Sequence, residues 1–152
     1  GDTAVAVHPE DPRYRALIGQ HVKHPFTDRQ IPIVGDAILV DPEFGSGAVK
    51  ITPAHDFNDF DVGKRHGLAN ITILNLDGTI NGEGGPFEGM DRFEARKAVK
   101  AKITELGLDR GAEPHTMALP RSQRSGAPVE PMGWRWITDW RFGAGAEITL
   151  PH

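Results

Sequence analysis

The sequence predicts a mixed α/β (α+β) fold, built on a curved, barrel-like β-sheet that is flanked by short helices. Short runs rich in β-branched residues recur along the chain, and each is closed by Gly, Pro or Asp, as in IPIVGD (31–36). Two other segments repeat their apolar residues at helical spacing. The length of 152 residues accommodates one domain of ordinary size. Short strands with interspersed helices are typical of this fold class.

Six short segments are expected to be strands, and they are residues 3–7, 31–34, 37–40, 48–52, 71–76 and 79–80. Gly35 and Asp36 separate the second and third runs, and such a pair between β-branched runs is typical of a hairpin turn. Asp77 and Gly78 predict a second hairpin, which joins the last two runs.

Two short helices are expected between these strands. Asp11, followed by a proline at the first helical position, begins a helix that ends at Gly19. Asp56 or Asn58 begins the other, which ends at Gly67. An interior glycine lowers the propensity of this second helix by about 1 kcal/mol relative to Ala.

A longer helix is predicted after residue 90. Asp91 and Glu94 form a capping box, and Gly107 lies where a left-handed C-cap is expected. The apolar residues expected on its buried side are Phe93, Val99, Ile103 and Leu106. From Pro114 onward the repeated prolines predict an irregular strap.

Composition excludes several classes of protein. The chain has no Cys, so thiolate zinc sites, disulfides and Cys nucleophiles are excluded. No apolar run approaches the roughly 20 residues that span a bilayer, and the first residues lack the pattern of a signal peptide. We therefore expect a cytoplasmic protein with no membrane partner. A formal net charge of -4 argues against generic polyanion binding, so any nucleic acid must meet a local patch.

The densest group of reactive side chains surrounds the fourth expected strand. Lys50 and Thr52 lie on one face of that strand, because alternate strand residues point the same way. His55, Asp56 and Asp59 follow at the turn into the next helix, where the two carboxylates share a face at i and i+3. These groups predict a pocket for a small cationic or hydroxylated group.

Two other interpretations of the same residues stay open. The carboxylates are also typical helix caps that offset the N-terminal dipole, in which case Lys50 and His55 are merely solvated. A divalent metal could instead be bound by carboxylates and imidazoles. The candidate ligands for such a metal are His55, Asp56, Asp61 and His66. No established ligand spacing supports the metal site.

Nucleic-acid and phosphate motifs are weak. GSGAVKIT and NGEGGPFEG lack the spacing of known phosphate loops. The basic residues of the long helix are more typical of a solvated face than of an RNA contact; they are Arg92, Arg96, Lys97, Lys100 and Lys102. Arg121 and Arg124 in the strap are better placed for RNA. The tryptophans 134, 136 and 140 are expected to cover a core edge rather than stack on bases.

Several strings carry a family likeness. They are GDTAVAVHPEDPRY (1–14), IPIVGD (31–36), DPEFGSGAVKITPAHDFNDFDVGKRHGL (41–68), LDGTIN (76–81), GMDRFEARKAV (89–99) and RSQRSGAPVEPM (121–132). In this order they closely resemble the inserted editing domain of valyl-tRNA synthetases, and more distantly that of the isoleucyl and leucyl enzymes. The KITPAHD signature is the most diagnostic. The resemblance implies the fold of these editing domains.

The resemblance also implies a hydrolytic proofreading function. Such a domain removes threonine wrongly attached to the 3′ end of tRNA(Val), so its partners would be that 3′ end, threonyl-tRNA and the remainder of the synthetase chain. Threonine and valine are isosteric, and an apolar pocket cannot strongly reject an isostere that adds a hydroxyl; valyl-tRNA synthetase with threonine is the standard example of this limit. A second site must therefore read the hydroxyl.

The resemblance assigns roles residue by residue. Asp59 matches the residue that holds the α-ammonium of the substrate, and Asp56 matches the one that reads the threonine hydroxyl. Lys50 and Thr52 match residues beside the ester and the terminal adenosine, and Phe44 matches a pocket wall.

His55 lies within the signature and is expected to orient its neighbours. No protein nucleophile is evident, so a positioned water is expected to attack the ester, without a metal or another cofactor.

The sequence also departs from the family pattern. A Thr-rich segment of the form TTRPET normally precedes GDTAVAV, and the sequence begins at Gly1 without it. Residues 121–126 lack the Cys pair that some members carry. Residues 133–152 match no recognised part of the family, so the predicted editing domain is 1–132, followed by a divergent segment. Two other functions remain: a hydrolytically inactive module that binds the tRNA 3′ end, and a metal-dependent phosphohydrolase that uses His55 and the Asp cluster.

Overall fold

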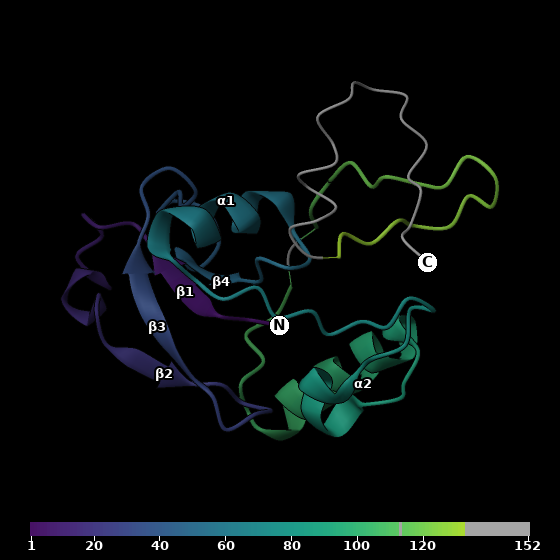
Figure 1. Cartoon of the computed structure of the whole chain (residues 1–152). Helices are drawn as coiled ribbons and strands as arrows, with labels where there is room; N and C mark the ends of the chain where they lie inside the picture. Colours follow the sequence, from purple (N-terminus) through teal and green to yellow (C-terminus); the bar gives the residue numbers. More distant parts are fainter. Residues whose placement is uncertain (113, 133–152) are drawn as a thin grey trace.

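A computed structural model of the chain describes residues 1–112 and 114–132 (Figure 1). Within this part, four strands form one sheet in the order β2-β3-β1-β4. Their bounds are Ala4–Val7 for β1, His21–Lys23 for β2, Gln30–Gly35 for β3 and Ala48–Ile51 for β4. Strand β1 is central and its sequence, AVAV, is almost entirely buried, as expected for a strand that is covered on both faces.

The sheet is mixed and open. Strand β1 runs parallel to β3 and antiparallel to β4, and β2 runs antiparallel to β3. The predicted α+β class is therefore confirmed. A closed barrel is not, because the edge strands β2 and β4 do not pair with each other among the described residues.

Helix α1 (Phe57–His66) lies over the sheet beside β4 and β1 (Figure 1). A hydrophobic core lies between them and consists of Ala4, Ala6, Val40, Ile51 and Val62. Gly63, the interior glycine, approaches the chain leaving β4 so closely that a Cβ would lie 3.0 Å from the Cβ of Pro53. Gly63 therefore lowers the helix propensity of α1 but allows the helix to pack closely against Pro53.

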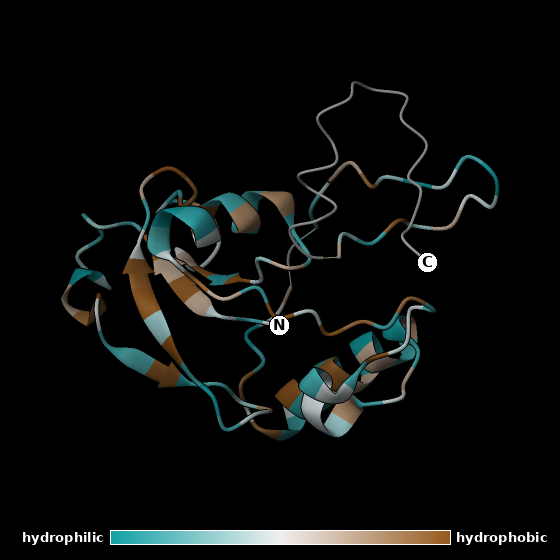
Figure 2. Cartoon of the chain, viewed as in Figure 1, coloured by the Kyte–Doolittle hydropathy of each residue, from teal (hydrophilic) through white to brown (hydrophobic). Residues whose placement is uncertain are grey.

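A second, smaller hydrophobic cluster lies among the helical segments that follow the sheet. The 3₁₀-helical segment η2 (Gly82–Phe87) and helix α2 (Arg92–Glu105) pack around Leu74, Ile80 and Ala95. Figure 2 shows apolar residues concentrated in the sheet, whereas the residues of α2 are mixed. Phe93 and Leu106 are exposed, so the apolar side predicted for α2 is only partly buried.

Both α-helices begin and end where the sequence predicts. The Asp56 side chain accepts a hydrogen bond from the N–H of Asp59, and Gly67 ends α1 in the left-handed conformation. Asp91 caps α2 by accepting from the N–H of Phe93.

The predicted strand at 37–40 is wrong, because residues 37–39 form a turn. The buried carboxylate of Asp36 accepts from two backbone N–H groups of this turn. It also accepts from Arg65 and contacts His66 Nε2 at 2.9 Å. Asp36 therefore ties the turn to the end of α1, and β3 pairs with β1 and β2 instead of with residues 37–40.

Other elements are shorter than predicted. The helix expected before Gly19 is reduced to a single 3₁₀ turn, η1 (Arg15–Leu17). The second predicted hairpin keeps its turn, but its strands are reduced to a bridge between Leu74 and Ile80. Strand β2 was not predicted, since only Val22 within it is β-branched.

The strap is irregular through residues 114–132, as predicted. The tryptophans 134, 136 and 140, like the whole predicted segment 133–152, lie outside the described residues. None of the described helices is both long and apolar enough to cross a membrane.

Candidate functional site

The candidate site lies where β4 ends and the chain turns into α1. Strands β1 and β4 are antiparallel, with Ala4 opposite Ile51, and the N–H of Thr3 donates to the carbonyl of Ile51 at 2.8 Å. Continued by one residue, this register places Thr3 opposite Thr52, and Asp2, the residue before Thr3, accepts a hydrogen bond from the Thr52 hydroxyl. The end of the strand pair thus brings together two polar residues that lie 50 positions apart in the sequence.

Asp59 is buried at the centre of this group, with 6% of its surface exposed. Its Oδ2 accepts the backbone N–H of Thr52 at 2.8 Å and lies 3.8 Å from the Nζ of Lys50. Its Oδ1 has no hydrogen bond to the described residues. Burial raises the pKa of the Asp59 carboxyl above its ordinary value, because desolvation penalises the charged form.

Lys50 and Thr52 lie on the same face of the strand end, as the period of two predicts. Lys50 Nζ donates to Thr52 Oγ1 at 3.0 Å, and Thr52 Oγ1 donates to Asp2 Oδ1 at 2.6 Å. Thr52 is buried, whereas 65% of the Lys50 side chain is exposed. The ammonium of Lys50 thus lies at the solvent boundary of the group.

Asp56 is placed so that it can both cap α1 and present an oxygen to a ligand. Its Oδ1 caps α1 by accepting the N–H of Asp59 at 3.0 Å, so the capping interpretation is correct for this oxygen. Its Oδ2 has no hydrogen bond within the described part of the chain. The helix cap therefore places one free carboxylate oxygen in the same first turn as Asp59.

His55 joins three segments of the chain. Its Nε2 accepts the N–H of Ile73 at 2.9 Å, so that nitrogen carries no hydrogen, and the Nδ1–H faces the carbonyl of Pro131 at 2.7 Å. Burial lowers the pKa of the imidazole below its ordinary value of 6.5. This neutral ring fastens the turn before α1 to the second cluster and to the strap.

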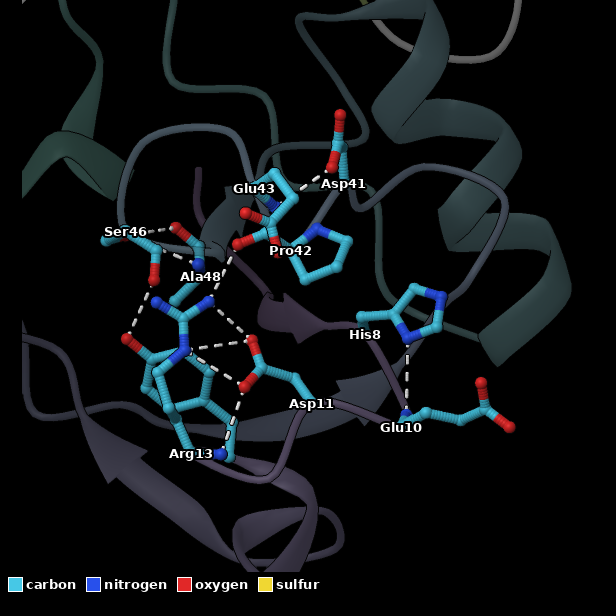
Figure 3. Close-up of polar contacts among 10 residues, drawn as sticks. His8, Glu10, Asp11, Arg13, Asp41, Pro42, Glu43, Ser46 and Ala48 are labelled. Carbon is cyan, nitrogen blue, oxygen red and sulfur yellow. Dashed lines mark hydrogen bonds and ion pairs between the residues drawn. The ribbon is translucent and has the colours of Figure 1, made fainter.

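Phe44 lies at the opposite end of β4, in the loop that enters the strand. A clamp holds this loop: Arg13 donates to the carbonyl of Pro42 at 2.7 Å, and Tyr14 donates to that of Ser46 at 2.8 Å (Figure 3). The Phe44 ring is 63% exposed and packs edge-on to His115. No contact joins Phe44 to Asp59 among the described residues, so its role as a pocket wall stays a prediction.

Among residues 1–112 and 114–132, three aspartates are buried, and Asp59 differs from the other two. Hydrogen bonds from Arg13 lower the pKa of Asp11. Burial opposes ionisation of Asp36, but bonds from a backbone N–H, Arg65 and His66 lower its pKa overall. Asp59 has no arginine partner in the described part of the chain, and its pKa is raised. A buried carboxylate with a shift of this kind beside a lysine is a candidate for ligand binding.

The residues of the metal hypothesis are separated by their contacts. His55 binds two backbone groups, Asp56 caps α1, Asp61 pairs with Lys64 at 2.8 Å, and His66 faces a different carboxylate. Within residues 1–112 and 114–132, no group of three or more His, Asp or Glu side chains is arranged to hold a metal ion.

The sequence did not single out Asp2 and His24. His24 Nε2 lies 3.4 Å from Asp2 Oδ2, so both belong to the polar group around Thr52. The available signal was the pairing of the first strand with the strand at 48–52, which places residue 3 opposite residue 52 and so brings residue 2 near it. His24 had no such signal, because it follows the unpredicted strand β2.

Comparison with known proteins gives a consistent result. The family profile described as "Leucyl-tRNA synthetase, editing domain" matches residues 10–104. The valine–tRNA ligase of Halalkalibacterium halodurans is 59% identical over 151 residues, which are 99% of this chain and 17% of that protein. The alignment therefore extends into residues 133–152.

Two further valine–tRNA ligases agree with this match. That of Streptococcus pyogenes is 56% identical over 92% of the chain, and that of Dechloromonas aromatica is 55% identical over 95% of it. The chain covers 15% of each of these two proteins. It thus spans about one sixth of the length of the relatives it matches.

Proposed function

Because this chain belongs to the editing-domain family of the aminoacyl-tRNA synthetases, and specifically to its valyl-tRNA synthetase members, we propose that it hydrolyses the ester bond of threonyl-tRNA(Val). The proposed partners are the 3′ end of tRNA(Val) and the remainder of a synthetase chain, and the proposed compartment is the cytoplasm. The observation that carries the proposal is the state of Asp59, which is buried and has a raised pKa and a free Oδ1.

Asp59 would hold the α-ammonium of the aminoacyl group. Its Oδ2 is occupied by the N–H of Thr52 and faces Lys50, whereas Oδ1 is free and 9% of the side chain stays exposed. An incoming ammonium would add a second positive charge, at Oδ1, to that of Lys50 and would lower the pKa of the buried carboxyl. Threonine and valine both carry this ammonium, so Asp59 would bind both substrates equally.

Asp56 would read the side-chain hydroxyl. Its Oδ1 is fixed by the helix cap, which leaves Oδ2 as a rigid acceptor. Threonine can donate a hydrogen bond to this oxygen and valine cannot. A site built to bind a hydroxyl discriminates strongly against a substrate without one, because its polar group is then left unpaired.

Lys50 and Thr52 would act at the ester. Water attacks the carbonyl carbon, the bond from that carbon to the ribose oxygen breaks, and one water proton ends on the ribose oxygen. The products are threonine and a tRNA with a free hydroxyl. The Lys50 ammonium, fixed by Thr52 at 3.0 Å, would stabilise the negative charge that develops on the carbonyl oxygen.

The test is deacylation of threonyl-tRNA(Val) and valyl-tRNA(Val), measured in parallel in the full-length protein that carries this chain. Asp56→Ala should reduce the preference for the threonyl substrate, whereas Asp59→Ala should slow both reactions alike. An equal effect of both substitutions on both substrates would contradict the role given to Asp56.

The same assay separates the remaining functions. Hydrolysis that persists in chelator supports the proposal, and loss of hydrolysis in chelator would favour a metal-dependent phosphohydrolase. Tight binding of the tRNA 3′ end without hydrolysis would instead identify an inactive binding module.

A further inference from the structure

Asp2 and His24 form a second layer behind Thr52. The hydroxyl of Thr52 donates to Asp2 Oδ1 at 2.6 Å, and His24 Nε2 lies 3.4 Å from Asp2 Oδ2. Thr52 and His24 are both buried, with 7% and 8% of their surfaces exposed. The three residues come from the chain before β1, the end of β2 and the end of β4, so only the folded sheet brings them together.

The hydrogen-bond directions in this group are fixed. His24 Nδ1 accepts the N–H of Phe26 at 3.2 Å, so the hydrogen of the neutral ring is on Nε2, the nitrogen that lies 3.4 Å from Asp2 Oδ2. Burial favours this neutral form of the ring and lowers the His24 pKa. Asp2 is ionised, because its bond from Thr52 and the charge of Lys50 outweigh burial and lower its pKa. An ionised carboxylate only accepts, so Asp2 accepts from Thr52 and presents its other oxygen as an acceptor to the His24 Nε2–H.

These directions decide what Thr52 offers a ligand. Its hydroxyl hydrogen is committed to Asp2, and one lone pair of Oγ1 accepts from Lys50. A hydroxyl oxygen has two acceptor lone pairs, so one remains. Donation to a carboxylate also makes the oxygen a better acceptor, since bonds in a chain polarise one another. Thr52 can thus accept a hydrogen bond from a ligand but cannot donate one.

We infer that Asp2 and His24 are positioning residues of the proposed editing site, which hold Thr52 as an acceptor for an O–H group of the reacting complex. That O–H belongs to the attacking water or to a ribose hydroxyl. The inference rests on the proposed function. Asp2 and His24 lie outside the KITPAHD signature, and they would fix the hydrogen-bond direction of Thr52, which lies inside it.

The decisive substitution is Asp2→Asn, because an amide cannot accept from both neighbours. If its oxygen faces Thr52, its NH₂ group meets the Nε2–H of His24. If its oxygen faces His24, its NH₂ group donates to Thr52 and takes the free lone pair. We expect kcat on threonyl-tRNA(Val) to fall about tenfold in the full-length protein, while KM changes by less than about twofold.

A second substitution should rescue the first. In Asp2→Asn/His24→Leu the conflicting N–H is gone, so the amide oxygen is free to accept from Thr52. We expect kcat to recover to within about threefold of the unsubstituted protein. If the contact were purely structural, the losses in kcat from the two substitutions would instead add. Asp61→Asn is the matched control, because Asp61 is an exposed carboxylate on α1 whose one ion pair among the described residues is with Lys64.

The outcomes separate this inference from the proposed function. An unsubstituted protein that does not hydrolyse threonyl-tRNA would overturn both. An active protein in which Asp2→Asn keeps its kcat, or in which His24→Leu deepens the loss, would overturn this inference alone. Melting temperatures of all variants identify any loss that comes from unfolding.

Discussion

The antiparallel pair of β1 and β4 carries a polar cluster at each end, and the two clusters differ in how completely they are paired. At the end that holds the loop with Phe44, Asp11 accepts from the backbone N–H and the guanidinium of Arg13 (Figure 3). At the other end, Asp59 accepts one backbone N–H and faces a lysine at 3.8 Å. The pKa of Asp11 is lowered and that of Asp59 is raised.

This difference separates a structural carboxylate from a candidate functional one. Asp11 has its arginine within the fold and stabilises the folded chain when ionised. Asp59 lacks such a partner among the residues that the structure describes, so its ionised form is held at a cost to stability. Charged groups at binding and catalytic sites commonly lack a full set of partners in this way. Such sites lower the stability of the fold, and the cost is retained because activity needs it.

The largest expected effect is on activity, at the under-paired end. Asp59→Asn removes the charge but keeps an oxygen that can accept the N–H of Thr52. Deacylation should fall about 10- to 100-fold, because a charge-assisted bond to the substrate is lost. The melting temperature at pH 7 should not fall, since a raised pKa means that ionised Asp59 does not stabilise the folded state.

Asp11→Asn should show the reverse pattern. The melting temperature should fall, because the amide cannot replace the carboxylate beside Arg13, while kcat should stay unchanged. If Asp11→Asn and Asp59→Asn lowered activity equally, the distinction between the two ends would be wrong.

The paired end can also be broken through its backbone. Gly47 has φ +74, and a Cβ there would lie 2.5 Å from Nη2 of Arg13. Gly47→Ala should destabilise the domain by about 1 to 2 kcal/mol, because an L-residue is strained in the left-handed region. Chemical denaturation measures this loss. Ser46→Ala is a milder comparison, since it keeps the Ser46 carbonyl that Tyr14 binds and removes only the exposed bonds between the Ser46 hydroxyl and the backbone of Ala48.

Acid should loosen the link between the under-paired end and the strap. The pKa of His55 is lowered by burial, so the unfolded chain binds a proton more readily than the folded one. Stability is therefore full above the ordinary pKa of 6.5 and is lost as pH falls through the folded value. The melting temperature should decrease from pH 7 to pH 5.

His55→Gln tests this assignment. It should lower stability at pH 7 by about 1 to 2 kcal/mol, because two hydrogen bonds are disturbed, and it should flatten the pH dependence. His24 has a lowered pKa as well, so His24→Leu should flatten the remaining slope. An undiminished slope in the double variant would contradict both assignments.

The smallest effect is expected at an exposed pair on α1. Asp61 and Lys64 lie 2.8 Å apart, but about 60% of each side chain is exposed. Asp61→Asn should change stability by less than about 0.5 kcal/mol and leave deacylation unaltered. A large loss of deacylation activity would instead support the hypothesis that Asp61 is a metal ligand.

Local chemistry made the helices and their caps predictable. Asp56, Gly67 and Asp91 act within one turn of their own backbone, so sequence alone places them. The same local rules placed Lys50 and Thr52 on one face and Asp56 and Asp59 in one turn. The family motif then gave these residues their proposed roles.

Strand pairing and hydrogen-bond partners were decided by the tertiary structure. Gly35 and Asp36 have the composition of a hairpin turn, yet Asp36 finds Arg65 and His66 nearly 30 residues away and holds a different turn. His55 was expected to orient its neighbours, and the fold shows it bound to Ile73 and to the strap.

Asp2 shows the same limit at the candidate site. The sequence by itself determined which residue types stand near the end of β4, because strand period and helix capping act over a few residues. The fold decided that Asp2 and His24 lie behind Thr52, and that Asp11 has an arginine partner whereas Asp59 has none within the described ranges. The pKa of a carboxylate depends on burial and on charges brought from distant parts of the chain, and no local pattern encodes these.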